Sequence, residues 1–340
     1  MRKLTDKWFI KQKISIKREE KCKERRKNTD DPFNKSKGIV FPDILSLRDK
    51  KSRSVLVNSV NKIRKIHTSS SEEKLYIDFN KVTTLYAPAT IYFSHVLEQF
   101  PKVNILSRAS KSSVVRSMLT RLELNKKLGL QPCYSNHDMV NWYTFRGTDL
   151  TFGKDYDEIE RILEENLSEE NFLIVNDAIS EAVSNVLNHA YEKHQRHLGW
   201  KVSLKVTDDF LSLVITDLGK SIPTTVPEKI DDQIINRLSN IFDFSNILGI
   251  DDAQLIDIGS QFRRSSTNQK HRGKGFGDML EVCKKVKESI LIVYSRRGVW
   301  TSDGQDYKKM TNYNNKIDGT IIFWKLPLNS PTDVEVGDGL

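Results

Sequence analysis

The sequence predicts a chain of the mixed α/β class (α+β in layout) with two folded parts. Over residues 72–150, segments with strand-like alternation and segments with helical spacing follow one another in the order strand, helix, strand, helix. Over residues 155–328, amphipathic helical patterns flank two apolar strands and a glycine-rich turn. The chain has 340 residues, which is enough for two domains of roughly 100–200 residues each.

The N-terminal segment is strongly basic. Residues 1–65 contain 21 Lys and Arg against 8 Asp and Glu, whereas the rest of the chain has a net charge of −4 within the total of +9. We therefore expect a basic arm over residues 1–70, with a helix near 54–66 and a serine-rich linker at its end. Such an arm either binds nucleic acid through counterion release or is a solvated leader.

The smaller folded part is expected over residues 72–150. Its predicted elements are strands at 74–79 and 103–106 and helices at 87–100 and 112–124. The run from Leu75 to Tyr86, followed by a helix, resembles a STAS domain. That resemblance implies a recognition or assembly module. STAS regulators carry a phosphorylatable serine at the turn into this helix. Residues 86–89 read Tyr-Ala-Pro-Ala here, so this phosphoacceptor is absent from the turn.

A helical pattern over residues 171–191 carries polar side chains beside an apolar face. Asp177, Glu181 and Asn185 are spaced by four and so lie on successive turns. A carboxylate and a carboxamide one turn apart can polarise a water and ligate Mg²⁺, which prefers oxygen ligands. Ordinary surface polarity also produces this spacing.

Two further segments have features of a nucleotide site. Strands at 201–206 and 211–216 lead into Asp217-Leu-Gly219, where a carboxylate can accept a hydrogen bond from an adenine amino group. Gly273, Gly275 and Gly277 precede a helix at 278–286, and a helix N-terminus favours phosphate. Walker and Rossmann readings are not favoured, because no Gly-Lys-Ser/Thr has the Walker spacing and no strand directly precedes Gly273.

The order and spacing of these segments resemble the N, G1 and G2 boxes of GHKL ATPases, most closely those of the bacterial anti-sigma-factor kinase type. His189-Ala190 follows the first box, and residues 318–324 resemble the family's terminal Gly-Thr strand. The resemblance implies a Bergerat-fold α/β sandwich over residues 155–328, with a mixed, mostly antiparallel sheet. The STAS-like domain precedes it, and residues 329–340 form a tail.

The resemblance also implies roles for individual residues. Glu181 activates the attacking water, and Asn185 holds Mg²⁺ against the phosphates. Asp217 binds the adenine amino group, supported by Thr320 through a water. The residues expected to contact ATP are Asn185, Asp217, Gly219, Gly273, Lys274, Gly275, Phe276, Gly277 and Thr320.

Residues 223–272 correspond to the ATP lid of the family, with helical patterns at 231–242 and 251–262. The cations before the glycines either reach the γ-phosphate or are solvated: Arg263, Arg264, Lys270 and Arg272. His189 is either a packed helix residue or a catalytic one.

The expected function is binding and slow hydrolysis of Mg-ATP, which switches the engagement of a partner. The alternatives are a protein serine/threonine kinase of the anti-sigma type and a nucleic-acid-associated effector. A sensor histidine kinase is not favoured, because His137-Asp138 lacks a surrounding helical pattern. Gyrase-like, MutL-like and chaperone-like members have a large transducer domain, whereas only residues 325–340 follow Trp324.

The expected partners are ATP, a protein, and nucleic acid at residues 1–65, with a homodimer as a further alternative. Cys22, Cys133 and Cys283 lie far apart and form neither a zinc pattern nor a disulfide framework. No apolar stretch approaches the ~20 residues of a membrane-spanning helix, and no secretory signal pattern is present. We therefore expect a cytoplasmic protein without a membrane partner.

Overall fold

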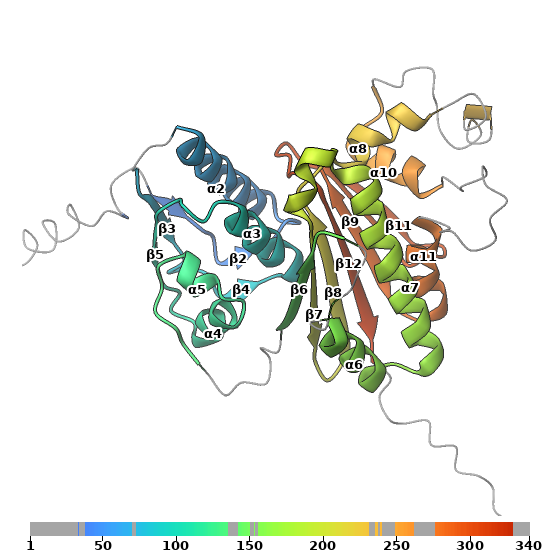
Figure 1. Cartoon of the computed structure of the whole chain (residues 1–340), viewed down its shortest axis with the longest axis horizontal. Coiled ribbons are helices and arrows are strands. Elements are labelled where there is room, and N and C mark those ends of the chain that lie inside the picture. The colour runs from blue at the N-terminus through green and yellow to red at the C-terminus, as the bar shows by residue number, and fades with distance from the viewer. Residues whose placement is uncertain are drawn as a thin grey trace, which may run out of the picture.

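The computed structural model describes residues 33, 38–69, 73–134, 142–149, 153, 156–230, 235–236, 239, 249–261 and 276–328. These residues form a mixed α/β structure in which a smaller parallel layer lies beside a large antiparallel sheet (Figure 1). The mixed α/β class predicted from the sequence is confirmed at this level.

The smaller layer is built from short parallel strands and the helices that connect them. Its three-stranded sheet has the order β1-β3-β5, and β2 pairs with β4 beside it. The strands are β1 (Ile39–Val40), β2 (Ile44–Leu45), β3 (Leu75–Asp78), β4 (Thr84–Leu85) and β5 (Ile105–Arg108). The helices are α2 (Lys50–Thr68), α3 (Ala87–Gln99), α4 (Ser113–Arg121) and α5 (Leu124–Lys127).

The arm expected over residues 1–70 is too long at its C-terminal end. Residues 38–69 belong to the smaller layer, because β1 pairs with β3 and α2 buries an apolar face that includes Leu56, Val60 and Ile63. Residues 38–69 are folded because their apolar side chains are buried, and the net charge of the segment does not predict that burial. The remainder of the predicted arm, residues 1–37, lies outside the described residues except for Phe33.

The large sheet has seven strands in the order β11-β10-β9-β12-β8-β7-β6. Every described pairing in it is antiparallel, so the expectation of a mixed sheet is wrong for the described strands. The strands are β6 (Trp142–Gly147), β7 (Trp200–Val206), β8 (Phe210–Asp217), β9 (Ile290–Ser295), β10 (Gly298–Ser302), β11 (Lys308–Asn312) and β12 (Thr320–Pro327). Because β6 pairs with β7, the smaller part ends before residue 142 and not at the expected residue 150.

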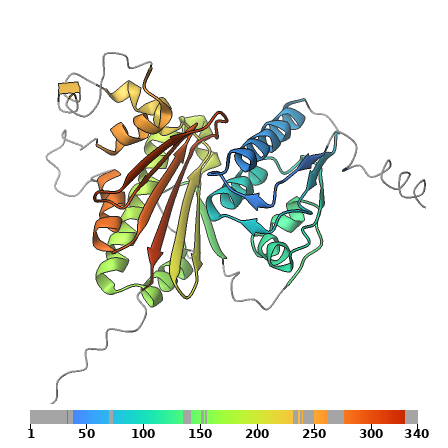
Figure 2. The same cartoon turned by 180° about the vertical axis from the view of Figure 1, so that it is seen from behind.

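Helices cover one face of the large sheet, and the smaller layer packs against part of the other, where α3 contacts β8 and β12 (Figures 1 and 2). In β8, Leu211, Leu213 and Ile215 pack beneath the helices, whereas Val214 packs in the core shared with the smaller layer. This alternation is the two-residue period of a strand buried on both faces. The two parts of the chain are therefore joined by a common hydrophobic core.

Two of the helices in this part, α7 and α10, begin at side-chain caps that the sequence supplies. Ser168 accepts from the backbone N–H of Asn171 at the start of α7, and Asp251 and Gln254 form a capping box on α10. The helical segments of this part are α6 (Asp157–Asn166), α7 (Glu169–Asn185), a π-helical turn (Val186–Ala190), a 3₁₀ turn (Lys193–Leu198), α8 (Ile222–Thr225), a 3₁₀ turn (Pro227–Lys229), α10 (Asp252–Ser260) and α11 (Phe276–Lys285). None of the described helices combines the length and the apolar character that a membrane crossing requires.

Candidate functional site

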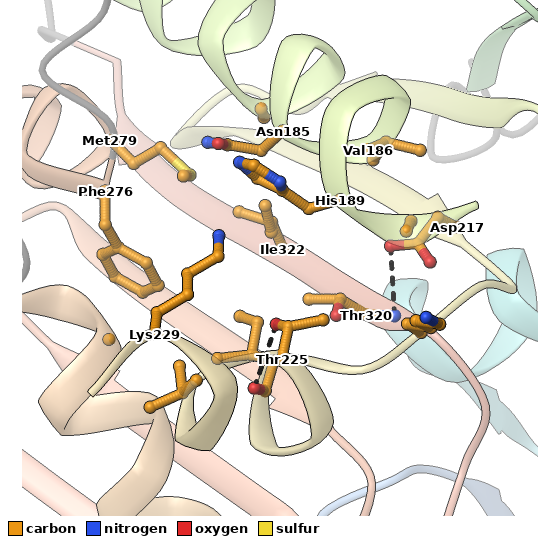
Figure 3. Close-up of a pocket in the computed structure, with 16 residues that line it drawn as sticks. Asn185, Val186, His189, Asp217, Thr225, Lys229, Phe276, Met279, Thr320 and Ile322 are labelled. Carbon is orange, nitrogen blue, oxygen red and sulfur yellow. Dashed lines mark hydrogen bonds between the residues drawn. The ribbon is translucent and has the colours of Figure 1, made fainter. Parts of the chain in front are cut away.

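A cavity of about 270 Å³ lies between α7, the helices α8 and α10, and the strands β8 and β12 (Figure 3). Its walls are largely apolar, and polar groups enter from a few positions. Its lining residues are Ala182, Asn185, Val186, His189, Ala190, Asp217, Lys220, Ile222, Thr225, Val226, Lys229, Gly259, Phe276, Met279, Thr320 and Ile322. An apolar pocket with a few convergent polar groups is the usual form of a small-molecule site.

Helix α7 brings one residue of the first predicted motif, Asn185, to this cavity, whereas Asp177 and Glu181 do not line it. Asn185 lines it, and the Asn185 amide donates to Glu181 Oε1 across one turn at 3.3 Å. Glu181 is buried, with 9% of its surface exposed. The Asn185 amide nitrogen thus faces the carboxylate, which leaves the amide oxygen as the atom that can ligate a cation.

The wall beyond Asn185 is a π-helical turn, Val186–Ala190. Such wider turns inside α-helices occur frequently at functional sites. The turn places Val186, His189 and Ala190 on the cavity, and Figure 3 shows the His189 ring pointing into it. His189 therefore lies on the cavity wall, and both interpretations of it, as a packed helix residue and as a catalytic residue, stay predictions.

Asp217 lies at the end of β8, on the floor of the cavity, and only 3% of its surface is exposed. Its carboxylate accepts two backbone hydrogen bonds, from Gly219 N to Oδ1 at 2.8 Å and from Thr320 N to Oδ2 at 3.2 Å. Burial raises the pKa of Asp217 to about 7, and these two hydrogen bonds act in the opposite direction. The group is a buried acceptor whose orientation is set from both sides.

A hydroxyl network supports the same floor. Ser295 Oγ lies 3.0 Å from Thr320 Oγ1, donates to Gly319 O and accepts from Ile222 N. Tyr191 closes the other side, because its hydroxyl accepts from Leu218 N and donates to Gly199 O, each at 2.8 Å. Thr320 was predicted from the sequence, whereas Ser295 and Tyr191 were not, because they belong to no motif.

Gly219 was expected to contact ATP, but in the structure its lack of a side chain serves a close backbone contact. A Cβ at this position would lie 2.2 Å from the carbonyl oxygen of Ala190, and Lys220 N donates to that same oxygen at 2.6 Å. Gly219 is therefore needed for the turn after β8 to approach the end of α7, and it does not line the cavity. It shapes the pocket indirectly, through Asp217 and Lys220.

The predicted lid is described in part. Its first segment supplies Ile222, Thr225, Val226 and Lys229 to the cavity, and α10 supplies Gly259. Figure 3 shows the Lys229 side chain extending into the space between Met279 and Thr225. The helix expected at 251–262 is confirmed as α10, whereas most of the helix expected at 231–242 lies outside the described residues. Lys229 was missed because one lysine after a proline carries no periodic signal.

The third predicted box, residues 273–277, is also described only in part. Phe276 opens α11 and lines the cavity, as expected for an ATP contact, but Gly277 does not line it. Gly273, Lys274 and Gly275 lie outside the described residues, as do the four lid cations at 263–272. Met279, one turn into α11, is an apolar wall residue that the motif did not include.

The donor set limits which cofactors the cavity could hold. Among the described residues, no group of three or more His, Cys, Asp or Glu side chains is arranged to hold a metal ion. A cation here would depend on Asn185 and on oxygens that a ligand brings. The volume is near the lower end, ~300 Å³, of small-molecule pockets.

Comparison of the sequence with protein-family models found no match, and neither did comparison with curated proteins.

Proposed function

We propose that residues 142–328, which include β6, form a Bergerat-fold domain of the GHKL type that binds Mg-ATP in the cavity between α7 and the lid segment. The support is the convergence of predicted residues from four separate segments on one pocket: Asn185, Asp217, Phe276 and Thr320. The STAS-like character of the smaller part belongs to the same proposal, supported by its parallel strands and connecting helices.

One observation carries the proposal. Asp217 is a buried acceptor on the floor of an otherwise apolar cavity, and two backbone donors fix its carboxylate. Because buried polar groups need partners, a planar base with an exocyclic amino group is the ligand class that completes this site. Adenine offers such an amino group together with an apolar face for Val186, Ile322 and Met279.

The other end of the cavity suits phosphates and their metal. ATP supplies the transferable γ-phosphoryl group, and Mg²⁺ neutralises the phosphate charge. Asn185 would hold the cation, which keeps most of its ligands as water and phosphate oxygens. Glu181, hydrogen-bonded to Asn185, would orient the attacking water and accept a proton from it. Gly273, Lys274, Gly275 and Gly277 stay proposed phosphate contacts.

Slow hydrolysis is the proposed output, with the lid segment coupling the bound nucleotide to a protein partner. A kinase that transfers the phosphoryl group to a protein hydroxyl would use the same Glu181, and no contact among the described residues favours it over hydrolysis.

Calorimetry with Mg²⁺ and a non-hydrolysable ATP analogue tests the site. We expect wild type to bind and Asp217→Asn to lose roughly 10- to 100-fold in affinity, because one of two buried acceptor atoms becomes a donor. Asp209→Asn makes the same chemical change at the opposite, exposed end of β8 and serves as the control. Equal affinity in all three proteins would overturn the proposal.

The same series includes Glu181→Ala, for which we expect retained analogue binding and lost release of phosphate from ATP. With γ-labelled ATP, label on a protein in place of free phosphate would establish the kinase alternative. Hydrolysis that persists without Glu181 would remove its role as base.

A further inference from the structure

The loop between β11 and β12 is held from the far side of the sheet by the smaller part of the chain. Arg53, on α2, is fully buried, and its guanidinium donates to Asn315 O at 3.0 Å and to Arg296 O at 2.6 Å. The Arg53 guanidinium also lies over the ring of Tyr313, 4.6 Å from its centroid. Burying an arginine is unfavourable unless its guanidinium has hydrogen-bond partners, and Arg53 has them here.

The end of this loop is held by two further side chains from the same part. The hydroxyl of Tyr92, on α3, donates to Asp318 Oδ2 and accepts from Asp318 N, both at 3.3 Å. Arg64, on α2, forms an ion pair with Asp318 Oδ2 at 2.6 Å. Tyr92 is fully buried, whereas the Arg64 and Asp318 side chains are about one-third exposed.

Asp318 is two residues from the floor of the cavity. Gly319 follows it with a φ of +63°. A Cβ there would lie 2.1 Å from Asp217 O, so only glycine fits this close approach of the two backbones. Thr320 comes next, and its N–H donates to Asp217 Oδ2. The path from Tyr92 to the Asp217 carboxylate thus runs through one carboxylate and three consecutive backbone units.

A second contact reaches the same strand end. His95, one turn after Tyr92 on α3, places Nδ1 2.8 Å from Thr216 Oγ1, and Thr216 directly precedes Asp217. Its Nε2 lies 3.4 Å from Leu198 O, which can only accept, so Nε2 carries the proton and Nδ1 accepts from Thr216. Burial lowers the pKa of His95 to about 4, so this neutral arrangement persists at neutral pH.

We propose that Tyr92 and Arg64 are positioning residues for the nucleotide site: by fixing Asp318, they set the orientation in which Asp217 accepts from the 6-amino group of the base. The inference rests on the proposed function. It assigns the smaller part of the chain to base recognition, and it makes that part a fixed component of the pocket.

The physical reason is the steep geometry of hydrogen bonds. Without the Tyr92 hydroxyl, Asp318 loses one donor and its backbone N–H loses its acceptor, so the segment that carries Thr320 N is held only by the Arg64 ion pair and by the Ser295 hydroxyl. A hydrogen bond weakens sharply once its distance or angle departs from the optimum, and Thr320 N already lies 3.2 Å from Asp217 Oδ2. Packing of the Tyr92 ring does not depend on the hydroxyl.

The test compares two ligands on four proteins. The ligands are a non-hydrolysable ATP analogue and the matching analogue whose purine lacks the 6-amino group, each with Mg²⁺. The proteins are wild type, Tyr92→Phe, Arg64→Gln and the control Tyr156→Phe, which removes a buried hydroxyl bonded to Asn176 between α6 and α7. Calorimetry gives the four pairs of dissociation constants, and thermal unfolding shows whether each variant is folded.

We expect wild type to prefer the amino-bearing ligand by roughly 10- to 100-fold, since one charge-assisted hydrogen bond is at stake. Tyr92→Phe should reduce that preference by roughly fivefold to tenfold while the amino-free analogue binds unchanged. Arg64→Gln should reduce it less, because the pair is partly exposed. Tyr156→Phe should leave the preference at the wild-type value.

The possible failures are distinguishable. If wild type binds neither ligand, or binds both equally, the proposed function is wrong and this inference is wrong with it. If wild type prefers the amino group and both folded variants keep the full preference, the proposed function stands and the positioning role is overturned. Equal loss of both ligands in the variants would also overturn it, because that outcome reports a structural role alone. Should Tyr92→Phe not fold, Arg64→Gln decides the matter.

Discussion

At the scale of single residues, the character of the site comes from Asp217. It is a carboxylate with 3% of its surface exposed, and burial raises its pKa to about 7. Ionising a group in such surroundings is unfavourable, and folded proteins keep groups of this kind mostly where a ligand uses them. The two backbone donors soften the penalty and fix the direction of both oxygens.

The raised pKa predicts how stability depends on pH. The folded state binds the Asp217 proton more tightly than the unfolded state, so this group stabilises the fold as the pH falls from about 7 toward its ordinary value of 3.8. Relative to Asp217→Asn, wild type should gain about 3 kcal/mol in unfolding free energy between about pH 8 and about pH 5. Denaturant unfolding of both proteins across this range measures the difference. A constant difference would show that Asp217 does not titrate there.

Single residues also show where motif reasoning stops. Glu181, Asn185, Asp217 and Thr320 could be named from the sequence because their spacing relative to helices and strands carries a signal. Tyr92 could not, because its hydroxyl acts on Asp318, 226 residues away in the chain.

At the scale of elements, the pocket depends on how closely the end of β8 approaches the end of α7. The turn after β8 passes the carbonyl of Ala190 so closely that residue 219 has no room for a side chain. The adjoining π-helical turn presents that carbonyl to Lys220 N. The position of the pocket wall is thus set by a backbone contact between two elements.

We therefore expect Gly219→Ala to displace one of these elements, lowering stability by about 2 kcal/mol or more and weakening nucleotide binding. Gly153→Ala adds the same methyl group outside the proposed site, at a position where no atom lies within 4 Å of the new Cβ. That control should unfold at the wild-type temperature or slightly above it. Thermal unfolding and calorimetry measure both, and a wild-type unfolding temperature in Gly219→Ala would contradict the proposed contact.

At the scale of the whole molecule, the large sheet needs covering on both faces. The helices cover one face, and part of the other is buried against the smaller layer by residues that include Val214, Ile292, Tyr294 and Ile321. The smaller part is therefore joined to the sheet by a common core and not only by a linker. This arrangement is what allows its side chains to reach the floor of the cavity.

A chain shortened to residues 142–340 should consequently fail to unfold cooperatively and should bind a hydrophobic dye, because one face of its sheet is exposed. A chain of residues 38–340 retains every described element and should unfold like the full chain. Calorimetric unfolding and dye fluorescence of the two shortened chains measure this. Cooperative unfolding of residues 142–340 would show that the two parts fold independently.

The sequence by itself determined the elements and the chemistry of the motifs. Helical spacing, strand alternation and caps such as Ser168 and Asp251 are local signals, so α3, α4, α7, α10, β7 and β8 could be predicted close to their observed bounds. The resemblance of the boxes to one family implied a common site for Asn185, Asp217, Phe276 and Thr320, and these four residues line one cavity.

Only the tertiary structure decided where the two folded parts begin and end, and which side chains of the smaller part contact the strand ends beside the cavity. Residues 38–69 joined the fold and β6 joined the large sheet because burial and strand pairing involve partners distant in sequence. The contacts of Arg53, Arg64, Tyr92 and His95 with the strand ends arise in the same way. Such contacts depend on where two surfaces meet in space, and a pattern of neighbouring residues carries no information about that.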